Sequence, residues 1–277
     1  MALEGHDLKS KSSSGLRIKQ LRSTVADLRA LFDDRITARY LAESFVAFDS
    51  VRSTSDVRAF MKHRDFDFIG VRIHGEVVGF ADFHDLDDGK LGDHVRPFAS
   101  HHLVDETDSV SDVLNRLRQE PCVYVQLMGQ PLGIITRADL QKAPVRMWLF
   151  ALLSLVEMQF LRLIRTRLTE EELLRTLEVR SSKRVQGEFN KRKKRNEETD
   201  LADCTGFSDK FLIVAKTMSL REELGFGSED AVMVVKRDYV TLRNNLAHGH
   251  IIGRDFSNLA RIAKGAEDLL HQCEAMN

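Results

Sequence analysis

Two stretches of the chain, Gly79-Phe-Ala-Asp-Phe-His-Asp-Leu86 and Gly133-Ile-Ile-Thr-Arg-Ala-Asp-Leu140, share their glycine, last aspartate and leucine at a constant offset of 54 residues. Upstream of each stretch, the sequence predicts a helix, a strand, a glycine-containing turn and a second strand. The predicted segments are 57–62, 68–73 and 77–81 in the first copy, and 113–118, 123–127 and 132–136 in the second. Because two copies of such a unit pack together when neither buries its apolar face alone, we expect one α/β domain here.

Beyond residue 142, every long segment has helical spacing, and Pro144 suits the first turn of the helix that follows. Helices are predicted over 144–168, from 170 into the basic segment, and over 211–220, 231–247 and 258–273. Thr169 with Glu172 forms a capping-box pattern, Ser208 and Ser228 are expected N-caps, and Gly249 is a stop signal. The predicted organisation is a mobile tail (1–25), an α/β domain (26–142) and an all-α domain of about five helices (143–277).

The composition excludes several classes of protein. With 43% hydrophobic and 30% charged residues and a net charge of −1, the chain is neither disordered nor a global polycation. Three cysteines without a CxxC pair argue against a disulfide scaffold or a zinc ribbon. The most apolar stretch, 148–163, is interrupted by polar residues and is shorter than the ~20 residues that a bilayer requires. The start has no signal-peptide core. We therefore expect a cytoplasmic protein without a membrane partner.

The repeated pattern resembles a tandem pair of CBS domains over roughly residues 30–142. In that family, paired domains commonly bind adenosine-containing ligands in clefts between the copies, which implies AMP, ATP or a related compound as a regulatory ligand. The resemblance assigns ribose and phosphate contacts to Thr136 and Asp139, with Arg137 nearby for phosphate. The first copy departs from the pattern, since Asp82 stands where Thr or Ser is usual. The alternative is that Thr136 and Asp139 only cap a helix.

Near the end of the predicted helix 231–247 stands Arg243-Asn-Asn-Leu-Ala-His248, in which Asn244 and His248 are four residues apart and share a helix face. Arg243 and His248 lie some 140° apart on an ideal helix, which a long Arg side chain can bridge. At the helix C-terminus, the dipole favours the protonated form of His248. The alternative is that Arg243 and His248 only decorate a helix end.

This segment resembles the R-x4–6-H signature of the HEPN superfamily, whose helical domains often dimerise and cut RNA without metal. The resemblance covers roughly residues 145–277 and implies a homodimeric endoribonuclease that needs no cofactor for catalysis. Attack by the RNA 2′-hydroxyl requires a proton acceptor and donor, here His248, and a cation against phosphorane charge, here Arg243. Asn244 is expected to orient one of the two.

A basic run, 180–195, holds eight Lys or Arg residues against the single acid Glu188. Such a run is usually a solvated helix face, although beside a nuclease Lys191, Arg192, Lys193, Lys194 and Arg195 could contact RNA phosphates. No metal motif is present: His94, His101 and His102 lie in the connection between the repeats without HExxH or a Cys/His cluster.

Taken together, the sequence predicts an α+β tandem CBS pair followed by an all-α, HEPN-like helical bundle. The leading hypothesis is an adenine-nucleotide-regulated, metal-independent RNA endonuclease acting as a homodimer, of the kind used as a stress toxin or in defence. Its partners would be RNA, an adenine nucleotide and an unidentified regulatory protein. The main alternative is a non-catalytic nucleotide sensor whose helical domain dimerises or binds a partner. A third is that the CBS-like pair serves only for dimerisation.

Overall fold

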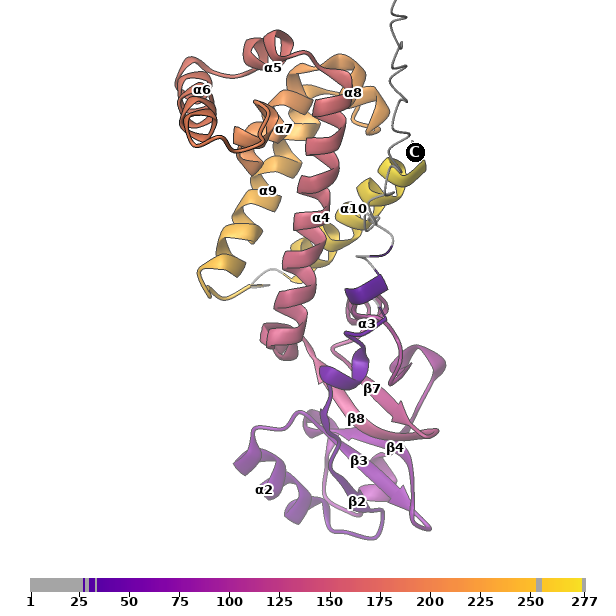
Figure 1. Cartoon of the computed structure of the whole chain (residues 1–277). Coiled ribbons are helices and arrows are strands. Elements are labelled where there is room, and N and C mark those ends of the chain that lie inside the picture. The colour runs from indigo at the N-terminus through magenta and orange to yellow at the C-terminus, as the bar shows by residue number, and fades with distance from the viewer. Residues whose placement is uncertain (1–26, 28–29, 33, 253–255, 276–277) are drawn as a thin grey trace, which may run out of the picture.

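The computed structural model describes residues 27, 30–32, 34–252 and 256–275. An α/β region and an all-helical region follow one another along the chain, and they meet where the last strand leads into a long helix (Figure 1). This order confirms the predicted fold class. The segment predicted as a mobile tail, 1–25, lies outside the described residues.

Two four-stranded sheets, ordered β2-β3-β4-β5 and β1-β8-β7-β6, form the α/β region. In both, the first long pairing is parallel (β2 with β3, β6 with β7) and the second is antiparallel (β3 with β4, β7 with β8). A short strand preceding one repeat completes the sheet of the other, since β1 pairs with β8 and β5 pairs with β4. The predicted duplication is therefore present in the fold. The strands are β1 (Glu43–Ser44), β2 (Ala47–Asp49), β3 (Phe68–Ile73), β4 (Glu76–Asp82), β5 (Arg96–Pro97), β6 (Leu103–Asp105), β7 (Cys122–Leu127) and β8 (Gln130–Thr136).

The glycine that opens each repeated stretch is required by a close approach between strands. A Cβ on Gly79 would lie 2.3 Å from the carbonyl oxygen of Arg96, and one on Gly133 would lie 2.9 Å from the Cβ of Ala42. These neighbours belong to the segments around the short crossing strands. The shared glycines thus allow each repeat to accept the short strand that completes its sheet.

The helices and 3₁₀ turns follow the predicted order with some different boundaries. The α/β region contains α2 (Thr54–Arg64), α3 (Val110–Leu117), η2 (Phe83–Asp85), η4 (Ser100–His102) and η5 (Arg137–Gln141). The described part of the helical region contains α4 (Ala143–Arg167), α5 (Glu170–Thr176), α6 (Val179–Lys194), η6 (Ala202–Cys204), α7 (Phe207–Lys216), α8 (Met218–Glu223), α9 (Glu229–Ala247) and α10 (Phe256–Ala275).

Three predicted boundaries in the helical region are wrong. The helix predicted over 211–220 is interrupted at Thr217, which ends α7 in an extended conformation before α8 begins. The helix expected from residue 170 is divided into α5 and α6, because Leu177 adopts an extended conformation and buries its side chain. Ser208 is not an N-cap: the Asp209 carboxylate accepts a hydrogen bond from the Gly206 amide at 2.7 Å, so α7 begins earlier. The capping box of Thr169 and Glu172 and the N-cap Ser228 are confirmed.

Helix α4 is the central helix of the helical region, and α7, α9 and α10 pack against it (Figure 1). Its length and apolar composition would suit a membrane span, but 61% of its most apolar window is buried inside the protein. Trp148 and Phe160 are among the largest fully buried side chains of the described chain. These are the properties of a core helix.

One apolar core runs through the second repeat and the helical region together. It contains Val113 of α3 and Ile135 of β8 as well as Trp148 of α4 and Phe256 of α10. The first repeat has a separate small core around Met61 and Ile69. The second repeat is therefore joined to the helical region by continuous packing.

Candidate functional site

A cleft of about 770 Å³ lies between the two repeats. Thr136 and Asp139, both predicted as ligand contacts, line one wall. Aromatic residues of the first repeat, Phe60 and Phe66, line the opposite wall, and Arg64 lies beside them with its guanidinium 6.0 Å from the Phe60 ring. The volume is that of a typical small-molecule site. The lining combines apolar side chains with polar and charged ones, Asp65 and Asp67 among them.

Thr136 and Asp139 also form the cap that the alternative interpretation expected. One carboxylate oxygen of Asp139 accepts from the Thr136 amide at 2.7 Å and from the Thr136 hydroxyl at 3.0 Å. The cap fixes the start of η5 and holds both side chains at the cleft wall. The capping role is thus observed, while contact with a ligand stays a prediction.

Lys142 neutralises the buried charge of Asp139. Its ammonium lies 2.9 Å from the second carboxylate oxygen of Asp139 and 2.5 Å from Glu43, which also lines the cleft. Burial opposes the charge on Lys142, but hydrogen bonds to Glu43 and Asp139 outweigh it and hold the pKa of the ammonium above its usual value. The cleft wall therefore carries a fixed, compensated cluster of charges.

Arg137 points away from the cleft. Its guanidinium donates two hydrogen bonds to the Leu117 carbonyl, at 3.0 and 3.3 Å, and lies 4.8 Å from the ring centroid of Phe256. Arg137 thereby connects α3, η5 and α10, and it is not among the residues lining the cleft. This placement does not suit the predicted phosphate contact, and Arg64 is the guanidinium that the structure brings to the cleft.

The residues just after the cleft wall hold the C-terminal end of α9. The side chain of Gln141 donates to the carbonyl of Ile252 and accepts from its amide at 3.0 Å. Arg146, in the first turn of α4, donates to the carbonyls of Asn245, Leu246 and His250 at 3.1, 3.1 and 2.8 Å. A cation is favourable there, because helix C-termini present unpaired carbonyls at the negative end of the dipole.

Helix α9 ends in a Schellman motif at the predicted stop signal. Gly249 has φ +71°, its amide donates to Leu246, and the His250 amide donates to Asn245 at 2.9 Å. His248 is the C-cap, with its ring 5.9 Å from that of His250. The predicted catalytic residues therefore lie on the segment that Gln141 and Arg146 hold.

Arg243, Asn244 and His248 present polar groups at this end of α9. Asn244 and His248 are exposed and Arg243 is half-buried. Within the described residues, none of the three has a hydrogen bond or ion pair from its side chain. The structure thus places them on one accessible helix end, and their catalytic roles stay a prediction.

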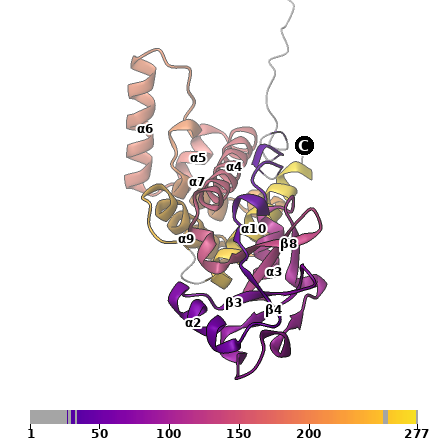
Figure 2. The same cartoon turned by 90° about the horizontal axis from the view of Figure 1, so that it is seen from below.

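The predicted RNA-contact residues lie elsewhere, on the last turn of α6 and just after it. Lys191, Lys193, Lys194 and Arg195 are exposed, and Arg192 pairs with Glu188 at 3.2 Å. Helix α6 stands at the edge of the helical region, away from the α/β region, in both views (Figures 1 and 2). The basic run and the end of α9 are therefore separate surfaces of one chain.

Sequence reasoning missed the residues that distinguish the two copies. The offset of 54 aligns Phe60 with Leu114 and Phe66 with Glu120, so only the first copy supplies an aromatic wall. Comparing the copies position by position would have identified these two aromatic residues. Gln141 and Arg146 had no such signal, because their partners lie about 100 residues away in the sequence.

The chain matches no family model, and the search of curated proteins finds no match either. Among solved structures, it is similar to the CBS-pair protein CBSX2 from Arabidopsis thaliana, with 16% identity over 40% of this chain and 95% of that chain and a TM-score of 0.36.

Two further solved structures are similar. For the CBS domain of the bacterial CNNM/CorC family Mg²⁺ transporter, the identity is 17% over 45% of this chain and 86% of that chain, with a TM-score of 0.35. For a hemolysin-like CBS-domain protein of Oenococcus oeni, the identity is 18% over 43% of this chain and 96% of that chain, with a TM-score of 0.33. On the strength of its own duplicated sheets and repeated stretches, the chain contains a CBS-like α/β region, followed by an all-helical region.

Proposed function

We propose that this protein is a nucleotide sensor: an adenosine-containing ligand binds in the cleft between the repeats and alters the C-terminal end of α9. The observation that carries the proposal is the cleft of about 770 Å³, with Thr136 on one wall and Phe60, Arg64 and Phe66 on the other. Aromatic rings suit a purine, a hydroxyl suits a ribose or phosphate oxygen, and a guanidinium suits a phosphate.

The connection to α9 supports the sensing part of the proposal. Asp139 at the cleft and Gln141 at Ile252 belong to the same short turn, η5, so movement of one end displaces the other. For a ligand to shift this connection, it must bind the two arrangements with different affinity. A ligand that draws Asp139 or Lys142 toward the cleft would meet this condition.

The test is calorimetric titration of AMP, ATP and S-adenosylmethionine into the full chain and two variants. Thr136→Val removes the hydroxyl but keeps the backbone amide that Asp139 caps, and Arg64→Ala removes the guanidinium beside the Phe60 ring. Each variant should weaken binding about tenfold, the value of one hydrogen bond to a charged group. Arg72→Ala is the matched control, because Arg72 pairs with Asp49 and does not line the cleft.

Binding that is undetectable for all three compounds, or equal in wild type and both cleft variants, would contradict the nucleotide proposal. The third alternative, in which the pair serves only for dimerisation, would then be preferred.

A second candidate function is metal-independent RNA cleavage by the helical region. The observation in its favour is that Arg243, Asn244 and His248 are accessible together at the end of α9. A second copy of the chain would bring two such sets together, as the predicted homodimer requires. The exposed cations of α6 would add sequence-independent phosphate contacts, whose contribution falls as salt rises.

This candidate is tested by incubating RNA with the protein in EDTA, with and without the nucleotide that binds. Cleavage that yields 2′,3′-cyclic phosphate ends and is lost in His248→Ala would support it. The matched control is His271→Ala, an exposed histidine on α10 whose loss should leave cleavage unchanged. Absence of cleavage under all conditions would leave the sensor as the function of the chain.

A further inference from the structure

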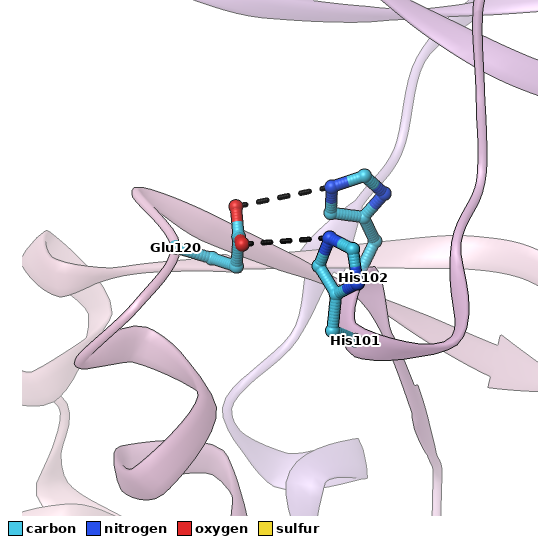
Figure 3. A group of neighbouring side chains, drawn as sticks. All are labelled: His101, His102 and Glu120. Carbon is cyan, nitrogen blue, oxygen red and sulfur yellow. Dashed lines mark ion pairs between the residues drawn. The ribbon is translucent and has the colours of Figure 1, made fainter.

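Three metal-ligating side chains from two separate segments converge beside the second repeat (Figure 3). His101 and His102 belong to η4, and Glu120 lies in the turn between α3 and β7. The Nε2 atom of His101 is 3.6 Å from one oxygen of Glu120, and the Nε2 atom of His102 is 3.8 Å from the other. The donor atoms of all three lie within 4.8 Å of one another.

The cluster occupies the counterpart of the nucleotide cleft. The offset of 54 aligns Glu120 with Phe66 and Phe80 with Ile134, and both Phe66 and Ile134 line the cleft. The ring of His102 packs edge-on against Phe80, with centroids 5.3 Å apart. Two residues join β1 to β2, whereas five join β5 to β6, and the longer connection forms η4. An insertion thus delivers both histidines to this position.

We propose that His101, His102 and Glu120 bind a divalent transition-metal ion, with Zn²⁺ the best match. Zinc holds imidazole nitrogen and carboxylate oxygen at about 2.0–2.2 Å, which in a tetrahedron separates the donors by about 3.4 Å. The two separations from Glu120, 3.6 and 3.8 Å, exceed this value by a few tenths of an ångström, and all three donor atoms lie within 4.8 Å of one another. Two nitrogens and one oxygen suit Zn²⁺, Co²⁺ or Ni²⁺, whereas Mg²⁺ and Ca²⁺ prefer oxygen alone. A water molecule would complete the coordination.

The two histidines face Glu120 without direct hydrogen bonds to it, since both separations exceed hydrogen-bond length. Burial and the neighbouring His101 lower the pKa of His102, although Glu120 opposes this effect. Arg116 of α3 also reaches η4, where its guanidinium donates to the Ser100 carbonyl at 2.8 Å.

Metal binding has a structural consequence at η4. The Ala99 amide donates to Nδ1 of His102 at 3.0 Å, which assigns the proton of the neutral ring to Nε2. When a metal takes Nε2, the ring proton must move to Nδ1, where it meets the Ala99 N–H. The Ala99 hydrogen bond is therefore lost on metal binding, and the start of η4 rearranges. A bound metal ion and the Ala99–His102 hydrogen bond of the metal-free turn therefore exclude one another.

The experiment titrates Co²⁺ and Zn²⁺ into the full chain after treatment with EDTA. We expect one ion per chain, with Co²⁺ giving the visible bands of a tetrahedral site and no thiolate charge-transfer band. His101→Ala and Glu120→Gln should each weaken Zn²⁺ binding at least about tenfold, because each removes a ligand. His63→Ala, an exposed histidine of α2 outside the cluster, is the matched control and should bind as the wild type does.

Hydrogen exchange of the Ala99 amide adds a readout specific to the ring proton, and it should accelerate when Zn²⁺ binds. Thermal unfolding in EDTA checks that the variants fold like the wild type. The proposal is overturned if the folded wild type binds no metal at micromolar concentration. It is also overturned if both ligand variants bind as tightly as the wild type, or if a thiolate band places the ion on a cysteine.

Discussion

Replacing Arg146 with Met tests whether the base of α4 holds the end of α9. The guanidinium donates three hydrogen bonds, at 3.1, 3.1 and 2.8 Å, to the carbonyls of Asn245 and Leu246 in the last turn of α9 and of His250 just after it. Hydrogen bonds to charged groups contribute about 1.5–3 kcal/mol each, but the bond to His250 is exposed and all three share one side chain. We therefore expect a total loss of about 2 kcal/mol in the free energy of unfolding. For a chain of this size, that loss lowers Tm by about 4–8 °C.

The assay is thermal and denaturant unfolding of Arg146→Met beside Arg175→Met. Arg175 is a matched control, since its side chain is 72% exposed and pairs with Glu171 on the surface of α5. Such a pair contributes at most about 0.5 kcal/mol. The amides of Gly249 and His250 should also exchange faster in Arg146→Met alone, because the Schellman bonds lose their support. Equal stability of the two variants, with unchanged exchange at these amides, would refute the reasoning.

Three further outcomes are expected. Burial raises the pKa of the Cys122 and Cys273 thiols to about 11. Neither should therefore react with a thiol reagent in the folded protein at pH 8, whereas both should react in denaturant. Rapid labelling of these two cysteines in the native chain would contradict this burial. Because the pKa of His102 is lowered in the folded state, the unfolded chain takes up this proton at a higher pH than the folded chain does. The free energy of unfolding in EDTA should therefore fall as the pH drops below about 6.5. His102→Gln should flatten this pH dependence in chemical denaturation, and an unchanged pH dependence would argue against the prediction. Ser228→Ala removes the acceptor of the Ala231 amide and should cost about 1 kcal/mol in urea unfolding, while a neutral result would mean that water replaces the cap.

Local patterns predicted much of the fold because they depend on neighbours in the sequence. The hairpins were predicted from Gly75 and Gly129, and both have positive φ, as a two-residue turn requires. The repeat was predicted because identical units need identical glycines and leucines. The break at Leu177 was not, because it depends on burial of that side chain in the core.

The parts of the candidate site that could be predicted are likewise those that depend on neighbours in the sequence. Thr136 and Asp139 form a local cap, so their spacing of three residues places both at the cleft. The direction of Arg137 depends on Leu117 and Phe256, which no local pattern connects to it. The convergence of His101 and His102 with Glu120 depends on the return of the chain through α3, so a search for consecutive metal motifs does not find it.

The central claim is that a ligand in the cleft alters the end of α9, and hydrogen exchange measured along the whole chain tests it most directly. With the nucleotide that binds, the account predicts altered exchange in residues 241–252 as well as at the cleft, and loss of both effects in Thr136→Val at the same nucleotide concentration. Protection of the cleft with unchanged exchange in residues 241–252 would show that ligand binding stays local, and it would contradict the account.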